Sequence, residues 1–394
     1  MSTTDDLNIS CIHCDPSYLQ FNMRFSIQKY FLQFVFTALL FSACTSQAIS
    51  PAATSSPQFA IVPNTPTPTL IPSPTATPTP QQLLFPYTID GLRNHQYQSG
   101  KIHIRQMLEQ TDVYTRYAID YPSDGLTITG IMQIPVHGKL PFPVIVMNHG
   151  YFNRDEYSPG DGTWRAAEYL NQRGYITLAS DYRSWGESDI GPSFYYSGLA
   201  IDVINLLNAI PYIPQADASR IGMWGHSMGG GVTVKVLTID LRVRAAVLYS
   251  TVSAEDADMI NRWGPGCIGD LSAGELQVGC NSSDIVPLTL PRDLIEAYSD
   301  SSTDPDLLEQ ISSFYHLDLV AAPVEINYGT ADGKTSAGAP PEWSKKLYQG
   351  LVDAGKDAQI FAYEGEGHSF NGDAWLAFME RSARFFDQYV KDAP

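Results

Sequence analysis

The strongest constraint on the fold is an alternation of short, mainly apolar stretches with segments in which apolar residues recur at helical spacing. Such stretches predict strands buried on both faces, because a strand with one face in water alternates apolar and polar residues. They cover residues 142–150, 175–180, 220–225, 243–250, 323–329 and 358–365. The helical segments cover residues 163–174, 195–210, 231–240, 341–355 and 374–390. This alternation predicts an α/β domain whose mainly parallel sheet carries helices on both faces.

Three segments before this series alternate apolar and polar residues. They cover residues 101–108, 113–121 and 126–135, with turn residues at 122–125, and predict earlier strands of the same sheet. We therefore expect one domain over residues 84–394. The alternation breaks between about residues 252 and 322. Because a structureless loop of this length is uncommon inside a compact domain, we predict a lid insertion there.

The N-terminal region, residues 1–44, has the order of a secretory signal. The stretch "MRFSIQKYFLQFVFTALLFSAC" has a basic start, an apolar run shorter than a membrane-spanning helix and small residues before Cys44. Its end resembles the lipobox of bacterial lipoproteins, in which the cysteine is lipidated, although Phe41 stands where leucine is usual. Met23 would begin a conventional signal, so residues 1–22 fit a misassigned start. We expect an exported protein held at the membrane only through a lipid on Cys44.

Residues 45–83 are rich in Pro, Thr and Ser. Such a tract cannot bury enough apolar surface to offset its ordering entropy, so we predict an extended linker between anchor and domain. If the protein is exported, we expect a disulfide between Cys267 and Cys280, because disulfides form in the oxidising environment outside the cytosol. The formal net charge is −18, which argues against a nucleic-acid partner. We expect no metal and no cofactor.

Ser227 lies in Gly225-His226-Ser227-Met228-Gly229, which matches the pattern G-x-S-x-G. A predicted strand precedes this motif and a predicted helix follows it, as in a nucleophile elbow, where the serine occupies a strained turn and glycines avoid clashes. The serine hydroxyl is then exposed beyond the carboxyl end of the sheet. The motif predicts a catalytic nucleophile. A glycine-rich helix entry that only packs closely is the alternative.

A serine nucleophile needs a base and a carboxylate that orients the base. In this arrangement the chain order is serine, acid, histidine. His368 follows the last predicted strand and Asp332 follows the strand before it, so we assign them as base and acid. Asp318, which precedes that strand, is the weaker candidate for the acid.

The oxyanion of an acyl-transfer intermediate needs two donors. One is the backbone N–H of Met228, directly after the nucleophile, and the other should come from the loop after an earlier strand. We assign the second donor to the Tyr151 N–H, since "MNHGY" ends such a strand and Gly150 allows close approach. His149 and His226 are expected to pack around the site and not to act as bases.

Five motifs in order ("VIVMNHGY", "SDYRSWGES", "ASRIGMWGHSMGGG", "GTADG" and "EGEGHSF") resemble the catalytic domain of prolyl-oligopeptidase-like α/β-hydrolases. That group includes acyl-peptidases, dienelactone-hydrolase-like enzymes and acyl esterases. The resemblance implies an α/β-hydrolase fold with an eight-stranded-type sheet, and it carries over Ser227, Asp332 and His368 as the triad. True prolyl oligopeptidases also carry a large β-propeller that filters substrates, whereas only a low-complexity tract precedes this domain.

Together these features predict a serine hydrolase that acts on small esters or short peptides through an acyl-enzyme. The motifs favour a peptidase, and the absent propeller favours an esterase. A ligand-binding surface lipoprotein without catalysis is the competing class. Such proteins typically lose a member of the triad, and all three are present here.

Overall fold

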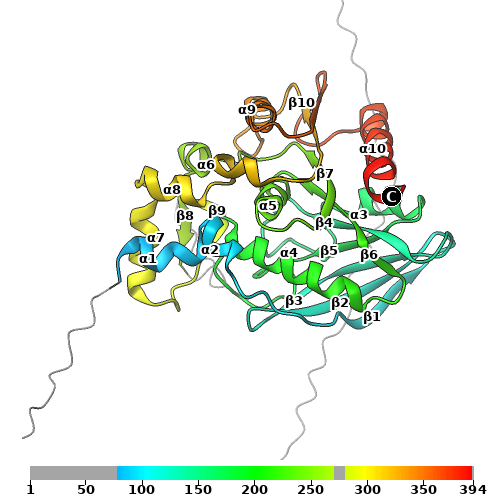
Figure 1. Cartoon of the computed structure of the whole chain (residues 1–394), viewed down its shortest axis with the longest axis horizontal. Helices are drawn as coiled ribbons and strands as arrows, with labels where there is room; N and C mark the ends of the chain where they lie inside the picture. Colours follow the sequence, from blue (N-terminus) through cyan, green and yellow to red (C-terminus); the bar gives the residue numbers. More distant parts are fainter. Residues whose placement is uncertain (1–77, 270–279, 393–394) are drawn as a thin grey trace, which may run out of the picture. The chain divides into compact units, whose positions relative to one another are not determined.

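The computed structural model describes residues 78–269 and 280–392 (Figure 1). The predicted signal, Cys44 and most of the predicted linker lie outside the described residues. The first helix, α1 (Pro80–Leu84), begins inside the range predicted as linker. Thr79 accepts a hydrogen bond from the Gln82 N–H, the Gln82 side chain caps Thr79 in return, and Leu84 is buried. The predicted boundary between residues 83 and 84 therefore falls within a helix.

Nine strands of the described ranges form one mixed sheet, in the order β1-β2-β3-β5-β4-β6-β7-β10-β11. These strands are β1 (His103–Gln110), β2 (Tyr114–Ser123), β3 (Leu126–Pro135), β4 (Phe142–Asn148), β5 (Ile176–Ser180), β6 (Ala216–His226), β7 (Val243–Tyr249), β10 (Val324–Gly329) and β11 (Ala358–Tyr363). The six from β5 to β11 in this order pair in parallel, and β1, β2 and β3 pair antiparallel at one side. The predicted mainly parallel sheet is confirmed, with nine strands in place of the expected eight.

Helices cover both faces of this sheet. On one face, α4 (Ser197–Ala209), α5 (Met228–Leu237) and α9 (Pro341–Asp353) share one apolar core with the strands. On the other, α3 (Trp164–Asn171) and α10 (Gly372–Phe386), which continues into the π-helix η5 (Asp387–Lys391), form a second core. Short pieces complete this part: η1 (Phe85–Tyr87), α2 (Ile89–Arg93) and η2 (Ile210–Tyr212). Burial of the sheet on both faces explains why its central strands β4 and β5 are mainly apolar along their whole length.

The insertion predicted for residues 252–322 lies between β7 and β10. It contains α6 (Asp256–Trp263), β8 (Gly266–Ile268), β9 (Asn281–Val286), α7 (Arg292–Ser301), α8 (Pro305–Ile311) and η4 (Ser313–Leu319). Helices α7 and α8 share an apolar core with α1 and with residues 194–195, and in Figure 1 they lie beside α1, away from α10. The short parallel pair β8–β9 is a finding that the sequence did not predict.

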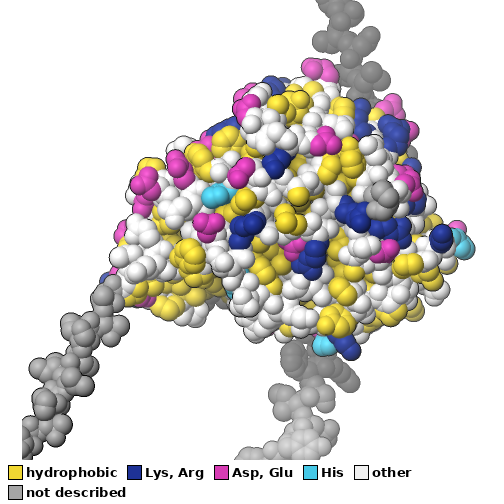
Figure 2. Space-filling model, in the orientation of Figure 1, with side chains coloured by type: hydrophobic (Ala, Val, Ile, Leu, Met, Phe, Trp, Pro, Cys, Tyr) yellow, Lys and Arg dark blue, Asp and Glu magenta, His cyan; other side chains and the backbone are white. Residues whose placement is uncertain are grey.

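A disulfide joins Cys267 in β8 to Cys280, directly before β9. Within the part of the chain that the structure describes, no helix is both long and apolar enough to cross a membrane. Figure 2 shows side chains of both charge signs interspersed over one face of the folded part, so the acidic excess is not gathered there into one surface.

A buried ion pair fixes the segment that follows β5. Arg183 donates to both carboxylate oxygens of Asp202 in α4, at 3.0 Å from Nε and 2.8 Å from Nη2, and both side chains are almost fully buried. The Asp202 carboxylate also accepts bonds from the Arg183 N–H and the Ser123 hydroxyl. The sequence motif "DYR" thus has an architectural role in the structure.

Removing one partner of this pair should be strongly destabilising, because it leaves a buried charge without compensation. We expect Arg183→Met to lower the free energy of unfolding by about 3–5 kcal/mol. Urea unfolding measures this change. Arg292→Met, which removes the exposed pair with Glu296, is the control and should cost no more than about 0.5 kcal/mol. Equal losses in both variants would contradict the prediction.

Candidate functional site

Four parallel strands end at the same edge of the sheet, and each carries one predicted site residue. Ser227 follows β6, Asp332 follows β10, His368 follows β11 and Tyr151 follows β4. Because parallel strands place their carboxyl ends together, residues far apart in the chain meet there. The edge is thus a candidate active site.

Ser227 occupies a strained turn between β6 and α5. Its φ of 55° and ψ of −121° lie where non-glycine residues are rare. The flanking glycines leave no room for side chains: a Cβ on Gly225 would lie 2.4 Å from the Gly229 carbonyl oxygen, and one on Gly229 would lie 2.0 Å from the Asn148 carbonyl oxygen. The helix α5 begins at Met228, not at residue 231 as predicted, so it starts directly after the serine.

Ser227, His368 and Asp332 form one chain of hydrogen bonds. His368 Nδ1 lies 2.9 Å and 3.1 Å from the two Asp332 carboxylate oxygens, and His368 Nε2 lies 2.8 Å from Ser227 Oγ. Because a carboxylate only accepts, Nδ1 carries the proton, and the serine hydroxyl donates to Nε2. This is the geometry in which an imidazole can take the serine proton. Asp318, the weaker candidate for the acid, lies in η4 and is exposed.

The loop after β4 runs directly beside the serine. A Cβ on Gly150 would lie 3.1 Å from Ser227 Cβ, so only glycine allows this approach without a shift. His149 Nδ1 lies 2.7 Å from the Gly150 carbonyl oxygen, which belongs to the same peptide group as the Tyr151 N–H. This bond fixes the orientation of that N–H. The Met228 N–H lies in the first turn of α5, where helical N–H groups lack partners within the helix.

Two further histidines surround the triad without joining it. His226 Nε2 donates to the His368 carbonyl oxygen at 3.0 Å, and its ring stacks on Tyr249 at 4.4 Å. His149 is fully buried among aromatic rings, of which Tyr182 is 4.4 Å away. Burial lowers the pKa of His149 to about 4 and that of His226 to about 3, so both are neutral near pH 7. They fit the packing role expected of them.

Some residues near the site carry no signal in the sequence. Ser282, in β9 of the insertion, donates from its hydroxyl to the Tyr151 hydroxyl at 2.8 Å. Arg262 and Trp263, at the end of α6, donate to the loop that carries Asp332. These contacts depend on where the insertion folds back, and no local pattern marks that placement.

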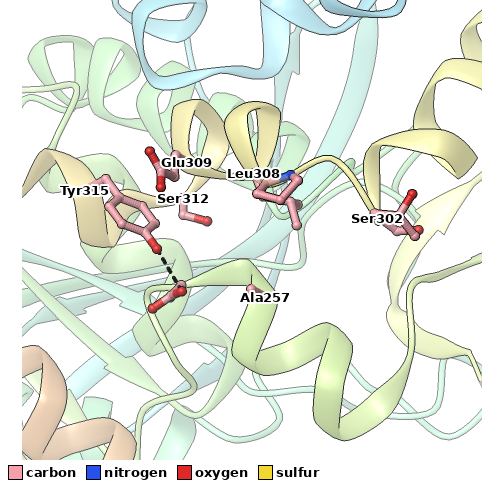
Figure 3. Close-up of a pocket in the computed structure, with 9 residues that line it drawn as sticks. Ala257, Ser302, Leu308, Glu309, Ser312 and Tyr315 are labelled. Carbon is pink, nitrogen blue, oxygen red and sulfur yellow. Dashed lines mark hydrogen bonds between the residues drawn. The ribbon is translucent and has the colours of Figure 1, made fainter.

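The insertion also contains a cavity of about 220 Å³ that none of the predicted site residues lines. It lies between α6, the α7–α8 turn and η4. Figure 3 shows Tyr315 turned across it toward the start of α6, where its hydroxyl donates to the Glu255 carboxylate at 2.8 Å. Apolar atoms dominate its wall. In the described ranges no cluster of three or more His, Cys, Asp or Glu residues could hold a metal ion.

This arrangement of strands and helices is similar to that of known proteins. A family model described as serine aminopeptidase, S33, matches residues 141–290, which include β4 to β7 and the elbow. The acetyl xylan esterase of Paenibacillus sp. R4 superposes with a TM-score of 0.54 at 18% identity, over 80% of this chain and 97% of that chain. The chain has the α/β-hydrolase fold.

Two other known proteins are similar to this chain. The acylaminoacyl peptidase of Pyrococcus horikoshii superposes with a TM-score of 0.53 at 18% identity, over 71% of this chain and 42% of that chain. An uncharacterized 31.7 kDa protein of Escherichia coli, from the traX-finO intergenic region, is 29% identical over 140 residues, 35% of this chain and 46% of that protein. The chain thus spans less than half the length of this relative. The fold implied by the prolyl-oligopeptidase-like resemblance is confirmed.

Burial of neutral His149 predicts that the free energy of unfolding depends on pH. In the unfolded chain His149 takes up its proton near pH 6.5, but in the folded α/β-hydrolase only near pH 4. Between these values the unfolded chain binds more protons, so the free energy of unfolding falls as the pH is lowered.

His149→Asn keeps a donor for the Gly150 carbonyl without titrating. We expect the stability difference between wild type and variant to fall by about 2 kcal/mol from about pH 7.5 to about pH 5. Urea unfolding at both pH values measures it, and a difference independent of pH would contradict the prediction.

Proposed function

We propose that this α/β-hydrolase is a serine hydrolase that cleaves small carboxylic esters or short peptide bonds through an acyl-enzyme. The observation that carries the proposal is the hydrogen-bond chain from Ser227 through His368 to Asp332. The strained backbone of Ser227 supports it, since such strain persists at functional sites where the surrounding structure imposes it.

The geometry supports the following sequence of steps. Ser227 Oγ attacks the substrate carbonyl carbon while His368 Nε2 takes the hydroxyl proton, and Asp332 stabilises the resulting imidazolium. The carbonyl oxygen becomes an oxyanion, which the N–H groups of Met228 and Tyr151 would bind. The intermediate then breaks its bond to the leaving group, which receives the proton from His368. Water repeats these steps on the acyl-enzyme, releasing the acid and restoring the serine.

Ester and amide substrates differ in what they demand from His368. An amine leaves only when it is protonated, whereas an activated phenolate leaves without that help, so a site that cleaves amides also cleaves activated esters. The similar proteins include both kinds by name, a serine aminopeptidase family and an acetyl xylan esterase. Short acyl p-nitrophenyl esters are therefore the first substrates to test, and aminoacyl p-nitroanilides the second.

Substitution of the triad should abolish turnover of these substrates. We expect Ser227→Ala to lower kcat by on the order of 10⁶-fold and to abolish labelling by a fluorophosphonate probe. Asp332→Asn should lower kcat by on the order of 10⁴-fold. Asp318→Asn, a matched change at the exposed aspartate in η4, should retain activity. Hydrolysis or labelling that persists in Ser227→Ala would refute the proposed mechanism. If wild type cleaves neither substrate class, the non-catalytic binding protein is the better hypothesis.

We also propose that the enzyme is exported and held at the membrane by a lipid on Cys44, with most of residues 45–83 as its spacer. The support is the order of basic, apolar and small residues before Cys44. Expression of the full chain in a bacterial host with metabolic labelling by a radioactive fatty acid tests it. Wild type should carry label and sediment with membranes. Cys44→Ser should lose both properties, whereas Cys11→Ser should keep them. Labelled Cys44→Ser protein would contradict the assignment.

A further inference from the structure

The loop that carries Asp332 covers residues 330–340, between β10 and α9, and is here called the acid loop. Its fold is tight. A Cβ on Gly338 would lie 2.5 Å from Asp332 Oδ1, and one on Gly333 would lie 2.7 Å from Pro340 Cα. The Gly333 N–H donates to Asp332 Oδ1 at 2.7 Å. A displacement of the loop backbone would therefore move the carboxylate.

Two side chains from the insertion hold this loop. Arg262 Nη2 donates to the carbonyl oxygens of Gly333 at 3.1 Å and Thr335 at 2.8 Å. Trp263 Nε1 donates to the carbonyl oxygen of Ser336 at 2.6 Å. Both residues end α6, at a sharp stop where Gly264 has a φ of 84°. Three carbonyl groups within four consecutive residues thus accept bonds from one helix end.

The helix α6 is itself fixed against the main domain. The rings of Trp263 and of Trp343, in α9, are nearly perpendicular, with their centres 5.2 Å apart. Nearer the start of α6, Lys346 of α9 forms ion pairs with Glu255 and, at 2.8 Å, with Asp258. Contacts at both ends of α6 make it a firm support for the acid loop.

Gly333 shows how this support reaches the triad. Its N–H bonds the Asp332 carboxylate, and its carbonyl group bonds the Arg262 guanidinium. The guanidinium is planar and always charged, so it can hold two carbonyl oxygens in a fixed relation. Asp332 in turn meets His368 through both carboxylate oxygens, a geometry that a small rotation would break.

We propose that Arg262 and Trp263 are positioning residues for catalysis, which hold the acid loop so that Asp332 stays against His368. This inference rests on the proposed serine hydrolase function. It gives the insertion a role in the site, because the orientation of the catalytic acid depends on where α6 lies. Both residues bond carbonyl groups of the acid loop, so they act through the position of Asp332.

Steady-state hydrolysis of a p-nitrophenyl ester by the disulfide-bonded protein tests the proposal. Arg262→Ala should lower kcat by about 10²-fold and Trp263→Phe, which keeps a ring against Trp343, by about 10-fold, with KM changed less than about threefold. Arg262→Lys should recover part of the loss. Arg292→Ala, an exposed arginine in the same insertion, is the matched control and should retain wild-type kcat.

Arg262→Ala introduced into the Asp332→Asn variant distinguishes positioning of the carboxylate from a general effect on stability. If Arg262 acts through Asp332, adding Arg262→Ala to Asp332→Asn should lower kcat by less than about threefold, since the two losses are not additive. A full 10²-fold further loss would overturn the proposal, as would wild-type kcat in folded Arg262→Ala and Trp263→Phe. Wild-type activity in Ser227→Ala is a different result, which overturns the proposed function itself. Circular dichroism confirms folding, and Trp263→Phe keeps the test open if Arg262→Ala does not fold.

Discussion

The contact between two backbones at the elbow is the constraint on which the rest of the site depends. Gly229 lies so close to the Asn148 carbonyl that no side chain fits, and this contact brings the end of β4 against the start of α5. The same approach sets Gly150 beside Ser227, and the serine has a positive φ. The candidate nucleophile and the candidate donors for its oxyanion are therefore placed by one packing requirement. The free-energy cost of the strained serine is borne by the buried sheet and helices around it.

The titratable groups near the site are either buried and neutral or bonded to a partner. Burial keeps His149 and His226 neutral near pH 7. His368, in contrast, bonds both a carboxylate and the serine hydroxyl. Farther out, Arg183 and Asp202 compensate each other inside the core. Asp332 is the carboxylate bonded to the His368 imidazole.

The central strands and the three residues of the hydrogen-bond chain at the candidate site could be predicted from the sequence because they depend on local patterns and chain order. Continuous apolar runs marked β4 and β7, the glycine spacing marked Ser227, and strand ends marked Asp332 and His368. The start of α5 was predicted three residues too late, because glycines at 229–231 are poor helix formers and close packing overrides that preference. Strands β8 and β9 and the contacts of Arg262 were not predictable, since pairings between distant segments leave no periodic trace in either one.

The bond between Cys267 and Cys280 makes the insertion sensitive to the compartment in which the chain matures. The two sulfurs close a ring around the residues that connect β8 to β9, and Ser282 at the start of β9 touches the Tyr151 side chain. In a glutathione-rich cytosol this ring would stay open, whereas an oxidising environment would close it. The compartment in which the protein is produced would therefore affect the purified molecule. Two preparations with identical sequences would differ in how firmly β9 is held against the Tyr151 side chain.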